Sequence, residues 1–304
     1  MSVSNRRRFL GVCAAGAAGV VAGDTLGCAA APGAAAPAAT AREAIGVNHD
    51  LHTHTIWSDG ASTIALHILE ARAFELDAVA ITDHYTPGSK IAESQEAFDR
   101  YLAEIERERS GQQDVIVIRG AEATALDATG RISIDERHAE RLEWVLCDLG
   151  GQSEGTLRRT PEDKRTYVEN VVRTYLGLCD VPYLDGIAHP FNTGNTRPSA
   201  LPADYPAHLL RELAAKMAEQ GKVFDVMNDM IYWFHQASLA PREFTAQYVE
   251  VVKLFAGAGV KFQVSSDDHR TGLGNTRWAQ LVVNRALVPA EQIVDPREIA
   301  RRRR

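Results

Sequence analysis

The sequence predicts an α/β fold, a distorted (βα)7 barrel in which seven parallel strands alternate with helices. From residue 45 onward, short apolar segments alternate with longer segments of helical periodicity. The apolar segments, such as DAVAIT and DVIVIRG, are typical of strands buried on both faces. No Gly-rich phosphate loop follows the first of them, which makes the alternative, an open doubly wound sheet, the weaker interpretation.

An N-terminal segment with the features of an export signal precedes this region. Residues 5–10 read NRRRFL, and an apolar segment (Gly11 to Ala22) and an Ala/Pro-rich tract to about Ala41 follow. The apolar segment is shorter than the roughly 20 residues that span a bilayer. Residues 6–10 resemble a twin-arginine signal, so we expect export in the folded state to the periplasm or the cell surface. We therefore assign residues 1–41 to a signal peptide and its tract.

Two other interpretations of this segment remain open. It could be a disordered Ala-rich tail, or a lipoprotein signal in which Cys28 becomes the lipidated first residue. No other segment is long and apolar enough to span a membrane. Cys147 and Cys179 follow later in the chain, and we expect them to be small buried apolar residues rather than a disulfide.

The charge of the chain argues against a nucleic-acid partner. Residues 1–40 carry three arginines and one aspartate, so the rest of the chain has a net charge of about −9. Four of its positive charges lie together at residues 301–304. Since nucleic-acid grooves need clustered Lys and Arg, we expect a small-molecule substrate instead.

The elements follow one another in a regular order. Strands are predicted at residues 46–51, 78–82, 114–120, 143–148, 184–188, 223–227 and 260–265. Helices are predicted at residues 62–76, 93–109, 161–178, 206–220 and 243–257. In the first helix Leu66, Leu69, Ala73 and Leu76 recur at helical spacing, after a capping residue, Ser62 or Thr63.

Five of these strands end in residues that can bind metal ions. The carboxyl ends of parallel strands meet on one face of a barrel, so these side chains should converge. On an extended segment His52 and His54 point to the same side and can share one ion. The candidates are His52, His54, Asp59, His84, Glu122, His189, Asp267 and His269.

The composition of this set predicts the type of metal. Mixed imidazoles and carboxylates suit Zn²⁺, Mn²⁺ or Fe²⁺ better than Mg²⁺ or Ca²⁺. The set is larger than one ion needs, and Glu122 could bridge two ions. We therefore expect two or three divalent ions, an arrangement used for phosphoryl displacement.

The strings HTHTIWSDG, AITDH, RGAEAT, IAHP and SSDDH occur in this order between residues 48 and 275. Together they resemble the PHP (polymerase and histidinol phosphatase) family, whose members have a distorted (βα)7 barrel with two or three metal ions. The resemblance implies a metal-dependent hydrolase domain over residues 42–300. It implies that one ion is held by His52, His54, Glu122 and Asp267. It implies a second ion at Asp59, His84 and His269, and a middle ion at Glu122 and His189.

One position departs from the family pattern. Family members usually have a His at the end of the fourth strand, but none occurs here between His138 and His189. Asp148 is the only obvious substitute, so either Asp148 replaces the imidazole or the middle site is weak or empty. Asp59, which many family members share, makes a close match to histidinol phosphatases less consistent with the sequence.

The expected activity is hydrolysis of a small phosphate ester by a metal-bound hydroxide. Arg270 and Arg197 are candidate phosphate clamps. Two alternatives stay open: a metal-dependent amidohydrolase-type enzyme, and a metal-binding protein without catalysis.

Overall fold

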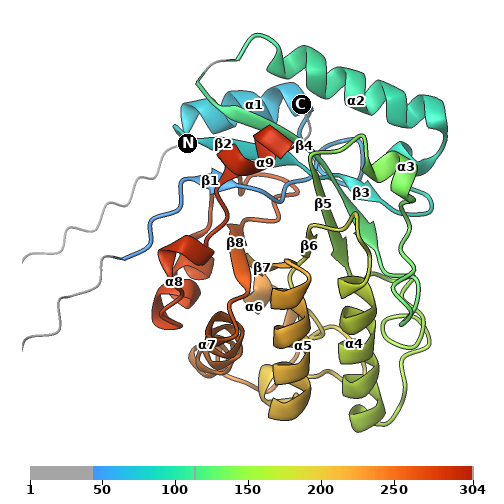
Figure 1. Ribbon diagram of the computed structural model, residues 1–304, viewed down its shortest axis with the longest axis vertical. Coiled ribbons are helices and arrows are strands. Elements are labelled where there is room, and N and C mark those ends of the chain that lie inside the picture. The colour runs from blue at the N-terminus through green and yellow to red at the C-terminus, as the bar shows by residue number, and fades with distance from the viewer. Residues whose placement is uncertain (1–43, 113, 303–304) are drawn as a thin grey trace, which may run out of the picture. The chain divides into compact units, whose positions relative to one another are not determined.

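The computed structural model describes residues 44–112 and 114–302, so the predicted export signal and Cys28 lie outside the described residues. The described residues form one parallel sheet that curls into a barrel, with helices on its outside (Figure 1). The strands are β1 (His49–Asp50), β2 (Ala78–Ile81), β3 (His84–Tyr85), β4 (Ile116–Thr124), β5 (Trp144–Asp148), β6 (Gly186–Ile187), β7 (Val223–Met227) and β8 (Lys261–Ser265). The helices are α1 (Ile64–Ala73), α2 (Gln95–Arg109), α3 (Glu136–Ala139), α4 (Lys164–Cys179), α5 (Ala207–Glu219), α6 (Met230–Trp233), α7 (Pro241–Gly257), α8 (Arg277–Arg285) and α9 (Pro296–Arg302).

The strand order confirms the predicted barrel class. The order is β1-β2-β4-β5-β6-β7-β8, every pair is parallel, and β3 also pairs with β4. β2 matches the second predicted strand, and a further two-residue strand that was not predicted, β3, follows it from His84. Both strands keep the same register on β4, which places His84 directly opposite Glu122.

The barrel is closed at the carboxyl ends of its first and last strands. Thr53 forms a parallel bridge with Asp268. The backbone N–H of His54 donates to the carbonyl of Asp268 (2.8 Å), and that of Asp267 donates to the carbonyl of His52 (3.1 Å). This seam brings together two segments that are more than 200 residues apart in the chain, and both carry candidate ligands.

Strand alternation explains why polar side chains collect inside the barrel at this end. Ile118, Trp144 and Leu146 belong to the apolar core inside the barrel. Because alternate residues of a strand share one face, the inward face of β4 continues from Ile118 to Glu122. The inward face of β5 continues in the same way from Leu146 to Asp148. Apolar residues therefore fill the barrel interior toward the amino ends of the strands, and charged residues fill it at their carboxyl ends.

The first helix was predicted correctly, but its buried face was not. Thr63 caps α1, as expected, and its hydroxyl accepts a hydrogen bond from Leu66 N (3.2 Å). However, Leu66 and Leu69 are 41% and 58% exposed, and Ile64 and Ile68 pack into the core instead. The leucines and the isoleucines follow the same helical period, so the spacing alone did not distinguish the two faces.

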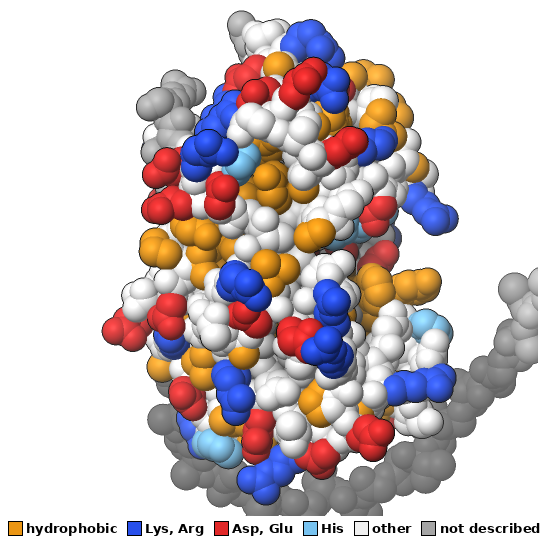
Figure 2. Space-filling view, turned by 90° about the vertical axis from the view of Figure 1, so that its right-hand side faces the viewer, with side chains coloured by type: hydrophobic (Ala, Val, Ile, Leu, Met, Phe, Trp, Pro, Cys, Tyr) orange, Lys and Arg blue, Asp and Glu red, His pale blue; other side chains and the backbone are white. Residues whose placement is uncertain are grey.

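Three further expectations concern cysteines, membrane spans and surface charge. Cys147 and Cys179 are buried and unpaired, as expected. Among the described residues, no helix combines the length and apolar character that a membrane span requires. On the face drawn in Figure 2, basic and acidic side chains are interspersed rather than separated into patches.

Candidate metal centre

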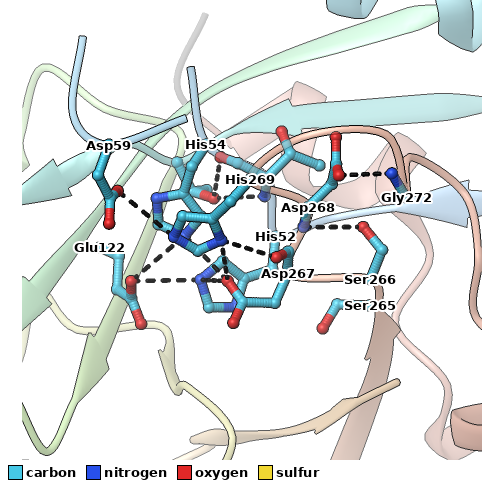
Figure 3. Close-up of polar contacts among 12 residues, drawn as sticks. His52, His54, Asp59, Glu122, Ser265, Ser266, Asp267, Asp268, His269 and Gly272 are labelled. Carbon is cyan, nitrogen blue, oxygen red and sulfur yellow. Dashed lines mark hydrogen bonds and ion pairs between the residues drawn. The ribbon is translucent and has the colours of Figure 1, made fainter. Parts of the chain in front are cut away.

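The predicted ligands converge at the carboxyl end of the barrel, as Figure 3 shows for several of them. His52 and His54, from the segment after β1, approach Glu122 of β4. Their Nε2 atoms lie 3.3 and 3.5 Å from Glu122 Oε2. The same two nitrogens lie 3.5 and 3.1 Å from Asp267 Oδ1. All four side chains are buried, so they form a compact set of two imidazoles and two carboxylates.

A second set lies nearer to solvent. Asp59 Oδ1 is 3.6 Å from His84 Nε2 and 3.4 Å from His269 Nε2. The ring of His54 lies between the two other imidazoles, with centroids 4.3 Å from His84 and 4.1 Å from His269. Ligand atoms of Asp59, His54, His84 and His269 all lie close enough together to hold one ion. The structure thus adds His54 to the three residues that the family resemblance implied for this ion.

His189 connects the two carboxylates of the first set. Its Nε2 atom lies 3.3 Å from Glu122 Oε1, as the implied middle site requires. It also forms a possible ligand group with His52 and Asp267, which the resemblance did not imply. His189 and Asp267 have positive φ angles of 30° and 56°. Backbone strain of this kind is concentrated at functional sites.

Asp148 stands beside the cluster without joining any of the ligand groups above. Its Oδ1 atom is buried and has no hydrogen-bond partner among the described residues. Burial and the negative charge of Glu122 raise the pKa of Asp148 to about 6. The charges of His84 and His189 act in the opposite direction and lower the pKa of Asp148. The Asp148 carboxyl therefore lies near the same imidazoles as the other carboxylates of the cluster.

The electrostatics of the cluster reflect several imidazoles that surround a few carboxylates. Burial lowers the pKa of His84, but the charge of Glu122, whose Oε2 atom lies 2.8 Å from His84 Nδ1, outweighs this effect and raises the pKa to about 10. Burial and the neighbouring His84 lower the pKa of His54 to about 3. Adjacent imidazoles cannot all be charged, so His54 stays neutral, the form in which histidine binds metals.

Asp225 is a buried residue that was not predicted from the sequence and that contacts the cluster through His52. The Nδ1 atom of His52 donates a hydrogen bond to Asp225 Oδ2 (2.9 Å), which leaves Nε2 free to face the cluster. Asp225 Oδ1 accepts a hydrogen bond from Ser265 Oγ (2.6 Å). Asp225 lies in the middle of the apolar strand VFDVM. A charge in such a strand needs a buried partner, and this was the signal that could have revealed it.

Two more aspartates of the strand-end motifs hold loops in place. Asp83 accepts hydrogen bonds from Thr55 N (2.7 Å), Thr55 Oγ1 (2.8 Å) and Ser58 Oγ (2.7 Å). It therefore fixes the turn that carries Asp59. Asp268 accepts from the backbone N–H groups of Arg270 (2.9 Å) and Gly272 (2.6 Å) and shapes the loop after His269 (Figure 3).

The two candidate phosphate clamps occupy different places. A cavity of about 710 Å³ opens above the cluster, and Asp59, Asp267 and His269 form part of its wall. Arg270 is exposed and lines this cavity. Arg197 is not among the residues that line this cavity.

Comparisons with known proteins agree with this architecture. The model of the PHP domain matches residues 50–256. A probable phosphatase of Caldicellulosiruptor bescii is 26% identical over 253 residues, which are 81% of this chain and 90% of the relative. A probable phosphatase of Caldanaerobacter subterraneus subsp. tengcongensis is 28% identical over 225 residues, which are 72% of this chain and 75% of the relative.

A solved structure shares the fold. It is the crystal structure of histidinol phosphate phosphatase from Lactococcus lactis subsp. lactis Il1403, complexed with zinc, L-histidinol and phosphate. It matches with a TM-score of 0.57 and 16% identity, over 79% of this chain and 93% of that chain. At this identity the likeness is one of fold. Since the PHP model covers more than half of the sequence, the chain belongs to the PHP domain family.

Proposed function

We propose that the protein is a metal-dependent phosphoesterase that hydrolyses a small phosphate ester. The observation that carries this proposal is a group of buried ligand atoms without hydrogen-bond partners among the described residues. They are His52 Nε2, His54 Nε2, Asp267 Oδ1 and both carboxylate oxygens of Glu122. Unpartnered buried polar atoms are costly, and cations placed among them would satisfy them all.

The residues fit divalent ions of the first transition row. Mixed imidazole and carboxylate ligands favour Zn²⁺, Mn²⁺ or Fe²⁺. We assign one ion to His52, His54, Glu122 and Asp267, whose ligand atoms approach one another, and a second to Asp59, His84 and His269. His54 also lies close enough to take part in the second site. Such ions lower the pKa of water and neutralise the charge of a reacting phosphoryl group. The reaction forms a new P–O bond to the oxygen of water, breaks the P–O bond to the leaving group, and releases phosphate and an alcohol.

The residues of the chain then have separate tasks. Asp225 keeps His52 in the tautomer whose Nε2 atom faces the cluster. Asp83 holds the turn of Asp59, so that this carboxylate reaches the outer imidazoles. Arg270 lies on the cavity wall, where its guanidinium can bind phosphate oxygens with two parallel hydrogen bonds.

We also propose that Asp148 takes the place of the imidazole that the family usually has, next to Glu122 and His189. Its inward position on β5 and its unpartnered Oδ1 atom support this role. We expect Asp148→Ala to bind fewer ions per chain than the wild type and Asp148→His to bind as many. An unchanged metal content in Asp148→Ala would show that Asp148 is not a ligand.

The main proposal is tested by metal analysis together with a panel of substrates. The protein is loaded with Zn²⁺, Mn²⁺ or Fe²⁺ and assayed with phosphomonoesters, phosphodiesters and amides. We expect turnover of a phosphate ester and a joint loss of metal and activity in His84→Ala. Turnover of amides alone would favour an amidohydrolase-type enzyme. Turnover of no substrate by the metal-loaded protein would favour a metal-binding protein without catalysis.

The segment NRRRFL supports a further proposal, that the protein is exported folded to the periplasm or the cell surface. Fractionation of cells that express the full chain tests this proposal, with a variant in which Arg6 and Arg7 are both replaced by Lys. Equal amounts of the two proteins outside the cytoplasm would contradict the twin-arginine route. Retention of the wild type in membranes through Cys28 would favour the lipoprotein interpretation.

A further inference from the structure

The cavity above the metal centre has one wall that the proposed reaction does not use. Besides the ligands, the cavity is lined by Tyr232 and Trp233 of α6, the helical turn that follows β7. Tyr232 is 66% exposed, more than any other large apolar side chain in the part of the chain that the structure describes. A large aromatic surface is therefore open to solvent at the entrance to the site.

The residues on either side of Tyr232 hold this wall in place. Met230 and Phe234 are buried, and the ring of Phe234 packs against Phe244 with centroids 4.4 Å apart. The rings of Tyr232 and Trp233 meet edge to face, with centroids 5.8 Å apart. The turn is thus anchored in the core by its ends, while Tyr232 stays on the cavity side. An aromatic ring with few remaining degrees of freedom loses little entropy when a ligand stacks on it.

A charged side chain lines the same cavity. Arg270 is exposed and forms no ion pair with any other described residue. The cavity therefore combines a cationic group for a phosphate with an aromatic face for the group that the phosphate esterifies. Its volume of about 710 Å³ lies within the range of small-molecule sites.

We infer that the substrate is a phosphate ester whose leaving group carries an aromatic ring, which stacks on Tyr232 while its phosphate reaches the metal centre beside Arg270. This inference rests on the proposed phosphoesterase function and names the substrate class of the same site. Offset or edge-to-face aromatic pairs contribute beyond simple burial of area, so Tyr232 would distinguish aromatic from aliphatic leaving groups of equal size.

Two esters with nearly equal leaving-group chemistry test the inference, 2-phenylethyl phosphate and 2-cyclohexylethyl phosphate. Both release a primary alcohol of similar size, so their kcat/KM ratio reports the preference for a ring with a π face. We expect the metal-loaded wild type to prefer the phenyl ester by about 2- to 12-fold. Tyr232→Phe should keep this preference, and Tyr232→Ala should lose it.

Phe74→Ala is the matched control, because Phe74 is an exposed aromatic residue at the end of α1 and does not line the cavity. It should keep the wild-type ratio. Equal kcat/KM values for both esters in the wild type, or an unchanged ratio in Tyr232→Ala, would overturn the inference. Absence of turnover for both these esters and the phosphoester panel would instead overturn the proposed function itself.

Discussion

Replacing Asp225 by Asn should weaken metal binding although Asp225 belongs to none of the ligand groups. Asp225 and His52 are both fully buried, and their atoms Oδ2 and Nδ1 are 2.9 Å apart. The carboxylate also accepts a hydrogen bond from Ser265. An asparagine of the same shape can accept from His52 through its amide oxygen and donate to Ser265 Oγ through its amide nitrogen, but it carries no charge. The hydrogen bond to His52 therefore loses the negative charge that strengthens it.

The size of the effect follows from this contact. Mutation of a residue that hydrogen-bonds a histidine ligand typically costs about 10- to 100-fold in metal affinity. This corresponds to about 1.4–2.7 kcal/mol at 25 °C. The buried position of the pair places the expected loss toward the upper part of this range, because solvent does not replace the missing charge.

The assay is a competition titration of metal-free protein with a chromophoric Zn²⁺ chelator at about pH 7.5, combined with elemental analysis. Glu143→Gln is the matched control, because Glu143 is a buried carboxylate that pairs with Arg109 (2.8 Å) next to the opposite end of β5. It should lower stability and leave metal affinity unchanged. The reasoning is refuted if a folded Asp225→Asn protein binds Zn²⁺ as tightly as the wild type, or if Glu143→Gln weakens binding equally.

Two further predictions concern Gly60 and His49. A Cβ at Gly60 would overlap the carbonyl oxygen of His54, so Gly60→Ala should cost about 1–3 kcal/mol of stability and weaken binding of the outer ion. Urea unfolding and metal titration check both effects. Gly46→Ala is the control, because its Cβ meets nothing within 4 Å, and it should change neither quantity. Burial lowers the pKa of His49 from 6.5 to about 4, so the unfolded chain binds this proton more readily and stability falls as the pH falls from about 7 to 4. This group alone should remove about 2 kcal/mol between pH 7 and 5. His49→Asn should lose that part of the pH dependence in urea unfolding, and an identical dependence in both proteins would contradict the assignment.

The predictions from the sequence succeeded where a local pattern determines the structure. Short segments such as DAVAIT had to be buried on both faces, and parallel strands of this kind bring their carboxyl ends together. His52, Glu122 and Asp267 were therefore expected at one end of the barrel, where the structure places them. Which atoms bind which ion stays a prediction.

The sequence did not predict features that depend on contacts between distant segments of the chain. Leu66 and Leu69 repeat at helical spacing but face solvent, because the packing of Ile64 and Ile68 on the sheet sets the rotation of α1. The short strand β3 was not predicted either, since β4 supplies the register that keeps His84 beside Glu122.

The sequence by itself determined the order of seven strands and the five longest helices, the end of the barrel at which the imidazoles and carboxylates gather, and the family resemblance. Only the tertiary structure decided that Asp225 supports His52, that Asp148 faces the cluster without joining its ligand groups, and that Tyr232 lines the cavity. The physical reason is that these contacts join residues far apart in the chain. Their distances depend on how the barrel closes between the segments of Thr53 and Asp268.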